Sequence, residues 1–78
     1  MAPPVGPVRA PEPGGAAGDR IRAARKTAGL TQQGLAAAVE VSRQTIISME
    51  TGDYAPSVYL AIKVARALDT PVEALWGP

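Results

Sequence analysis

The chain has 78 residues, no cysteine and no histidine, and its eight basic and seven acidic residues give a net charge of +1. This length allows one domain at most, and so short a chain buries only about 60% of the surface that its unfolded form exposes. The missing cysteine and histidine remove thiolate ligands, disulfides and the commonest general base. The carboxylates are scattered and no glycine-rich phosphate loop follows a strand-like run, so we expect no enzyme, cofactor or metal site. No apolar run approaches a membrane span and no signal pattern opens the chain, which predicts a soluble, cytoplasmic protein without a membrane partner.

The charges are unevenly distributed along the chain. Residues 19–43 contain five basic and two acidic side chains, whereas residues 44–78 contain two basic and four acidic ones. One half of the domain is therefore electropositive, although many solvated surfaces show such a split by chance.

Residues 1–18 differ in composition from the rest of the chain. They contain five of the eight prolines, four glycines and only two valines. Such a segment cannot bury enough apolar surface to offset its ordering entropy, so we expect a disordered tail with some polyproline II character. The spacing Pro4-Val5-Gly6-Pro7 is that of a proline-recognition motif. It leaves a protein partner through residues 1–18 open beside the simpler interpretation of a flexible tail.

From residue 19 to residue 78 the pattern predicts one domain built from helices only. The first three helices are expected over residues 20–28, 32–39 and 43 to about 49, followed by a long helix and a short last one. Their expected capping residues are Asp19, Thr31, Ser42, Ser57 and Thr70, the last followed by Pro71 at the first helical position. Gly29 and Gly52 are expected to end the first and third helices. The side chains expected to face the core are Ile21, Ala24, Ala28, Leu35, Ala36, Val39, Ile46, Met49, Leu60, Ala61, Val64, Ala65 and Leu68. The fold class is therefore all-α with five helices.

The third helix has an unusual outer face. At about 100° per residue, Ile46 and Met49 fall together and face the core. The opposite side holds Arg43, Gln44, Ile47 and Ser48. These residue types suit the edges of bases, because arginine bonds guanine, glutamine bonds adenine and an apolar group contacts the thymine methyl. This helical-wheel pattern, taken alone, is explained equally well by a solvent-exposed surface that is merely polar.

The preceding helix favours the base-reading interpretation. Two short helices joined by a three- or four-residue turn form a helix-turn-helix, whose second helix enters the major groove of DNA. Gln32 and Gln33 open the first of these helices, where free backbone N–H groups and the helix dipole attract a phosphate. Without the motif, contact of Gln32 with water alone would be the simpler interpretation.

Several short stretches together resemble one known family. They are Arg20-Ile21-Arg22, Gly29-Leu30-Thr31-Gln32, Leu35-Ala36, Val41-Ser42-Arg43-Gln44-Thr45-Ile46, Glu50, Gly52, Pro56-Ser57, and Ala65 with Leu68. In this order and spacing they resemble the XRE-type helix-turn-helix family, to which the small phage repressors also belong. The resemblance covers residues 19–76, and it implies a five-helix, lambda-repressor-like DNA-binding domain.

The resemblance also implies roles for individual residues. It pairs Arg25 with Glu50, which would clamp the first helix to the end of the recognition helix. It assigns bases to the outer face of the third helix and phosphates to Gln32 and to the loop after Gly52, with Thr45 in either group. The resemblance, combined with the helical-wheel pattern of the third helix and with the helix N-termini, predicts that Arg43, Gln44, Ile47 and Ser48 read bases. The residues predicted to bind phosphates are Gln32, Gln33, Ser42, Thr45 and Tyr54.

The chain departs from the family pattern at three positions, and the negative charges of two of them, Glu40 near the DNA backbone and Asp53 in the loop, reduce the expected affinity. Glu40 stands in the turn where glycine is usual, and holding it at positive φ costs on the order of 1 kcal/mol. Gly34 lies inside the second helix, where it costs about 0.5–1 kcal/mol relative to alanine. Asp53 replaces a more basic loop, which leaves Tyr54 as the phosphate donor there. We therefore predict modest affinity for DNA.

The favoured function is a sequence-specific transcriptional regulator, in particular a repressor that occupies a promoter. It would bind double-stranded DNA as a homodimer on half-sites about 34 Å apart. The candidate dimer interface is Val72, Leu75 and Trp76, although closure of the monomer's core explains Trp76 at least as well. The alternative is a protein-interaction module, antitoxin-like or bridging, in which DNA binding is secondary. The weak net charge, Glu40, Asp53 and the proline-rich tail favour that alternative.

Overall fold

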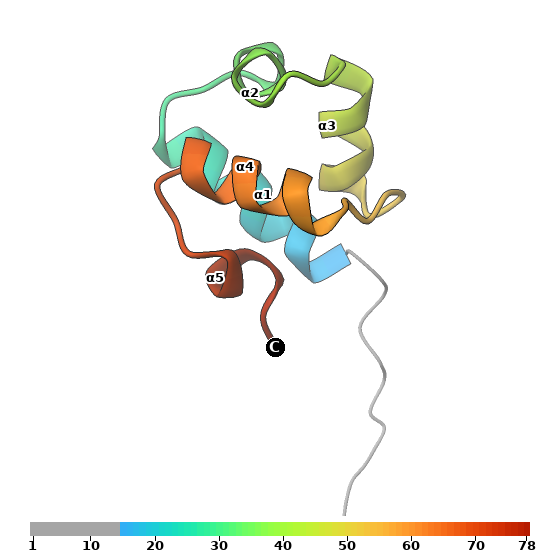
Figure 1. The fold of residues 1–78 in the computed structure, drawn as a ribbon, viewed down its shortest axis with the longest axis vertical. Helices are drawn as coiled ribbons and strands as arrows, with labels where there is room; N and C mark the ends of the chain where they lie inside the picture. The colour runs from blue at the N-terminus through green and yellow to red at the C-terminus, as the bar shows by residue number, and fades with distance from the viewer. Residues whose placement is uncertain (1–14) are drawn as a thin grey trace, which may run out of the picture.

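The computed structural model describes residues 15–78, and this part of the chain forms five α-helices and no strand. The helices are α1 (Gly15–Thr27), α2 (Gln32–Val39), α3 (Arg43–Thr51), α4 (Val58–Ala67) and α5 (Val72–Trp76). Figure 1 shows α2 at one end of the molecule and α5 at the other, with α1 and α4 between them. The prediction of an all-α, five-helix domain is confirmed.

All five helices contribute to one core. α1 packs against α3 and α5, α2 packs against α3 and α4, and α4 packs against α5. Burial of each larger aliphatic side chain stabilises the fold by about 1.5–3 kcal/mol. The buried hydrophobic residues are Ile21, Leu35, Ala36, Val39, Ile46, Met49, Val64, Ala65, Leu68 and Leu75.

Three helices begin at hydroxyl caps, as their sequences predict. In each case the cap residue has an extended backbone and its side-chain oxygen accepts a hydrogen bond from a backbone N–H three residues on. Such a cap contributes about 1 kcal/mol. The three bonds are Gly34 N–H to Thr31 (2.9 Å), Thr45 N–H to Ser42 (3.2 Å) and Leu60 N–H to Ser57 (3.2 Å).

The helix ends depend on left-handed residues. Gly29 and Gly52 have φ of 76° and 88°, as expected for glycines that end helices. Glu40 ends α2 with φ 63° and ψ 45°, and its N–H donates to the carbonyls of Ala36 and Ala37. The left-handed conformation usually given to glycine is therefore carried by a glutamate in this turn.

The start of α1 differs from the sequence prediction. The helix begins at Gly15 rather than at residue 20, so Asp19 lies inside it and caps nothing. The reason is tertiary: Gly18 is buried, and a Cβ at that position would collide with the backbone carbonyls of Glu50 and Met49. Close packing against the end of α3 therefore extends α1 into residues 15–18, which composition alone predicts to be disordered. The predictions for residues 1–14, including a protein partner, lie outside the described residues.

Two further predictions about packing are wrong. Ala28 follows the end of α1 and is exposed, because the chain has already entered the turn at Gly29. Thr70 does not cap α5; its hydroxyl donates to the carbonyl of Leu68 (2.9 Å), and Pro71 is the N-cap.

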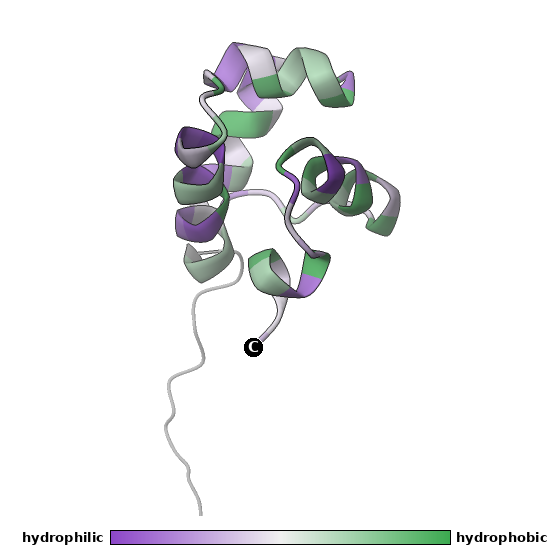
Figure 2. Cartoon of the chain, turned by 90° about the vertical axis from the view of Figure 1, so that its left-hand side faces the viewer, coloured by the Kyte–Doolittle hydropathy of each residue, from purple (hydrophilic) through white to green (hydrophobic). Residues whose placement is uncertain are grey.

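The short helix α5 closes the core of the monomer. Figure 2 shows mostly hydrophobic residues in this helix, beside the C-terminus. Leu75 is only 1% exposed, so it cannot form a dimer interface as expected, because the chain's own core already covers it. Val72 and Trp76 are partly buried and pack against the same core, with part of each side chain still exposed.

Candidate nucleic-acid interface

Helices α2 and α3 form a compact pair joined by a three-residue turn. α2 ends at Val39 and α3 begins at Arg43. Within the turn, the Val41 N–H donates to the carbonyl of Ala36 (3.0 Å), which ties the turn back onto α2. The two helices pack directly against each other, with Leu35 and Ile46 wholly buried. This is the geometry of a helix-turn-helix, with α3 in the position of the helix that enters the major groove.

The outer face of α3 carries the four residues expected to read bases. Arg43 and Gln44 are exposed, whereas Ile47 and Ser48 are half-buried. The Gln44 amide lies 3.5 Å from the Ser48 hydroxyl, one turn further along the helix. All four therefore keep part of their surface open to solvent.

The first turn of α3 presents hydroxyl groups beside free backbone donors. The side chains of Ser42 and Thr45 are hydrogen-bonded to each other at 3.0 Å, Ser42 being exposed and Thr45 half-buried. Backbone N–H groups in the first turn of a helix have no partner within the helix and can bind an anion. This arrangement is suited to a phosphate oxygen.

The other phosphate candidates lie in separate segments. Gln33 is exposed in the first turn of α2, and Tyr54 is 42% exposed in the loop that follows α3. The hydroxyl of Thr51, the last residue of α3, donates to a carboxylate oxygen of Asp53 in that loop (3.1 Å). The loop therefore combines a phenol donor with a carboxylate that repels phosphate.

A buried carboxylate joins the three helices around this surface. The side chain of Glu50, at the end of α3, is 1% exposed. Arg25 from α1 donates to it twice, from Nε to Oε2 at 2.6 Å and from Nη2 to Oε1 at 3.2 Å. A third arginine nitrogen, Nη1, donates to the carbonyl of Leu30 (2.9 Å). This two-point geometry fixes the orientation of α1 relative to α3, since arginine and carboxylate bond best in this planar arrangement.

Gln32 belongs to the same cluster. Its amide nitrogen donates to Glu50 Oε1 at 3.2 Å, so the donor that the sequence assigns to a phosphate has a partner within the protein. Burial by itself would raise the pKa of Glu50. The hydrogen bonds from Arg25 and Gln32, with the charges of Arg25 and Arg22, outweigh burial and hold that pKa below its ordinary value. Glu50 therefore stays ionised and holds the start of α2 against the end of α3, a link that the sequence does not indicate.

The described part of the chain contains no helix long and apolar enough to cross a membrane. Among residues 15–78, histidine, cysteine and carboxylate side chains form no group of three that could hold a metal ion.

These features define a DNA-binding helix-turn-helix protein, and comparisons with known proteins agree. The family model described as Helix-turn-helix (HTH_3) matches residues 21–75. The chain therefore belongs to the XRE-type helix-turn-helix family, and it is a DNA-binding transcriptional regulator.

Similar proteins come from archaea and bacteria. The chain is 58% identical over 48 residues to an uncharacterized HTH-type transcriptional regulator of Methanothermobacter thermautotrophicus, covering 62% of this chain and 70% of that protein. It is 46% identical over 57 residues to another such regulator, from Archaeoglobus fulgidus, covering 73% and 81%. A solved structure, the restriction-modification controller protein C.AhdI of Aeromonas hydrophila, matches with a TM-score of 0.74 and 31% identity. That match covers 78% of this chain and 92% of the other.

Proposed function

We propose that this regulator is a repressor that reads a specific DNA sequence by inserting α3 into the major groove. One observation carries the proposal. Arg43 and Gln44 lie exposed in the first turn of α3, whereas Ile46 and Met49 of the same helix are buried in the core. Arginine and glutamine form two-point hydrogen bonds with guanine and adenine, so this pair can discriminate between base pairs.

Phosphate contacts are proposed on both sides of this helix. The exposed hydroxyl of Ser42 and the exposed amide of Gln33 stand at two helix N-termini, where an anion is favoured. Thr45 and Tyr54 complete the proposed set. The amide nitrogen of Gln32 is already bonded to Glu50. Gln32 can therefore contact a phosphate in two ways: its side-chain oxygen can orient a bridging water, or its side chain can release Glu50. The pair Arg25–Glu50 is assigned a structural role.

We further propose that two copies bind one inverted repeat and block a promoter by occupancy. A single module reads few base pairs, whereas two modules on half-sites one helical turn apart, about 34 Å, read enough for specificity. The partly exposed Val72 and Trp76 are the remaining candidates for contact between the copies. No catalytic role is assigned to any residue, and the cytoplasm is the proposed location because the operator would be there.

The experiment is selection of random duplex DNA on the purified protein, followed by sequencing of the bound fraction. The test variant is Arg43→Ala/Gln44→Ala, which removes both proposed base contacts. The control is Arg66→Ala, which removes an exposed cationic side chain from α4, outside the proposed interface. All selections are run at low salt as well, where phosphate contacts are strongest.

The expected result is an enriched inverted repeat for the native chain and the control, and its loss in the test variant. Enrichment that survives in the test variant would assign base reading to another surface. Absence of any enrichment at low salt would contradict sequence-specific binding and favour the protein-interaction alternative. A reporter gene behind the selected repeat then separates repression from activation.

A further inference from the structure

Arg22 of α1 lies beside the buried carboxylate of Glu50 and has no part in the function proposed above. Its Nε lies 3.8 Å from Glu50 Oε1, and its Nη1 lies 3.9 Å from a carboxylate oxygen of Asp19. Both distances exceed that of a hydrogen bond, so neither carboxylate accepts from these two nitrogens. The side chain of Arg22 is 45% exposed, compared with 10% for Arg25. The surrounding charges therefore hold a guanidinium in place without using these N–H donors.

The carboxylate oxygen of Glu50 also connects Arg22 to the start of α2. Gln32 Nε2 donates to Glu50 Oε1 at 3.2 Å, and Arg22 Nε lies 3.8 Å from the same atom, so at most about 7 Å separates the two nitrogens. Each N–H···O bond spans about 2.9 Å, so donors at this separation can bond two oxygens of one phosphate group. Gln32 and Gln33 open α2, where a phosphate contact is already proposed. Arg22 adds a positive charge beside that site.

The charges around Glu50 leave Arg22 available to an anion. Arg25 donates twice to Glu50 and is buried with it, so these two charges compensate each other inside the protein. Among residues 15–78, Asp19 is the other carboxylate within 4 Å of Arg22, and its side chain is 79% exposed. An exposed ion pair of this kind contributes little, because water and salt screen it. A phosphate can therefore take the place of Asp19 beside Arg22.

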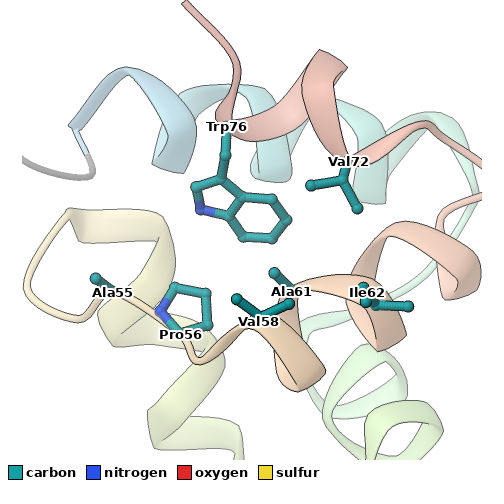
Figure 3. Close-up of a pocket in the computed structure, with 7 residues that line it drawn as sticks. All are labelled: Ala55, Pro56, Val58, Ala61, Ile62, Val72 and Trp76. Atoms are coloured by element: carbon teal, nitrogen blue, oxygen red, sulfur yellow. The ribbon is translucent and has the colours of Figure 1, made fainter.

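The surface formed by α4 and α5 is different in kind. Figure 3 shows the indole of Trp76 extending from α5 toward Pro56 and Val58 across an apolar pocket. The residues that line this pocket carry no charge and are Ala55, Pro56, Val58, Ala61, Ile62, Val72 and Trp76. A phosphate backbone has no counter-charge in that pocket, whereas α1 offers one beside the helix-turn-helix.

We propose that Arg22 binds a DNA phosphate together with the start of α2, as a contact made from outside the helix-turn-helix pair. Arginine suits this role because its planar guanidinium bonds two phosphate oxygens at once. Such a contact fixes the position of the domain on the duplex and carries no sequence information. This role of Arg22 rests on the function proposed above, because it requires that α2 and α3 dock on DNA.

The test is the salt dependence of binding to a fluorescent duplex of arbitrary sequence, since phosphate contacts do not depend on sequence. The variants are Arg22→Ala, which removes the proposed contact, and Arg22→Lys, which keeps the charge. The control is Arg66→Ala, which removes an exposed arginine from α4. Urea denaturation of each variant measures its stability separately.

Loss of one phosphate contact in Arg22→Ala should reduce the magnitude of the slope of log K against log salt concentration by about 0.9. The slope should be restored in Arg22→Lys and unchanged in Arg66→Ala. The urea midpoint of Arg22→Ala should stay close to the native one, because Arg22 is exposed and too far from Glu50 for a hydrogen bond. A merely structural role would lower the folded fraction and leave the slope unchanged, and that result would overturn the proposal.

Asp19→Asn tests the same contact from the side of the competing carboxylate. It should tighten binding when Arg22 is present and have a smaller effect in the Arg22→Ala background. An equal gain in both backgrounds would overturn the exchange of Asp19 for phosphate.

The two proposals fail in different ways. If Arg22→Ala kept the native slope while the selection experiment enriched an inverted repeat, the role of Arg22 would be overturned and the proposed function would stand. Absence of binding by the native chain at low salt would overturn both.

Discussion

Arg25 and Glu50 form a buried ion pair that connects α1 to the end of α3. The guanidinium Nε lies 2.6 Å from the carboxylate Oε2, and the side chains are 10% and 1% exposed. Gln32 donates to the same carboxylate from the start of α2. A single acidic side chain therefore holds both helices of the helix-turn-helix against the rest of the domain.

We predict that Glu50→Ala lowers the free energy of unfolding by about 3–5 kcal/mol, because it leaves Arg25 buried without a counter-charge. A domain of this size has about 4–12 kcal/mol in total, so this loss would remove a large share of its stability. Urea denaturation followed by circular dichroism measures the loss. The control, Asp53→Ala, removes an exposed carboxylate close to Glu50 in sequence and should change stability by less than about 0.5 kcal/mol. Equal effects of the two variants would contradict a structural role for the pair.

The same carboxylate predicts a dependence of stability on pH. The pKa of Glu50 is lowered in the folded protein from its ordinary value of 4.5. Its contribution is therefore fully present above about pH 4.5 and is lost as the pH falls through the lower, folded pKa. The free energy of unfolding of the native chain should drop in this acidic range, and that of Glu50→Gln should drop less steeply. Parallel curves for the two proteins between pH 2 and pH 6 would refute the assignment.

Much of this fold can be predicted from the sequence, because local chemistry decides it. Thr31, Ser42 and Ser57 cap their helices since a hydroxyl beside free N–H groups has one obvious partner. Gly29 and Gly52 end helices because few other residues accept positive φ. The burial of Ile46 and Met49 follows from helical periodicity alone.

The parts that could not be predicted depend on contacts between distant segments. Composition assigns residues 15–18 to a disordered tail, yet packing of Gly18 against the end of α3 makes them helical. Nothing in the neighbourhood of Gln32 indicates that its amide meets Glu50, since eighteen residues separate the two. Leu75 has the same hydrophobic character whether it closes a core or binds a partner, so only the fold decides between them.

Glu40 provides a test of backbone strain in the turn between α2 and α3. Its φ of 63° suits glycine, so Glu40→Gly should raise the free energy of unfolding by about 0.5–1 kcal/mol. Glu40→Ala is the matched control, since it removes the same carboxylate and its exposed contact with Lys63 (3.5 Å) but keeps a Cβ at positive φ. Both variants should strengthen DNA binding by removing a negative charge near the phosphates. Thermal denaturation separates them, and equal stability of the two variants would contradict the strain argument.

Variants of two helix-capping serines distinguish an effect on stability from an effect on DNA binding. Ser42→Ala and Ser57→Ala each remove a side chain that accepts a backbone N–H at 3.2 Å, so each should cost about 1 kcal/mol of stability. Only Ser42 lies at the proposed phosphate site on α3, whereas Ser57 begins α4. Binding of labelled duplex at low salt should therefore weaken in Ser42→Ala and stay unchanged in Ser57→Ala. A loss of binding in both variants would trace the effect to stability alone.

Arg43 and Tyr54 distinguish base reading from phosphate contact. Arg43 is exposed at the start of α3, and its proposed partner is a guanine edge. Arg43→Ala should weaken binding to the selected operator by about 1–3 kcal/mol and relax the preference at one base pair per half-site. Tyr54→Phe removes only a hydroxyl that is proposed to bond a phosphate, so it should weaken all sequences by the same factor. Titration of the operator and of a set of single-base variants measures both effects. If Arg43→Ala lowered affinity for every sequence equally, the side chain would be a phosphate contact and the reading of bases would fall to Gln44, Ile47 and Ser48.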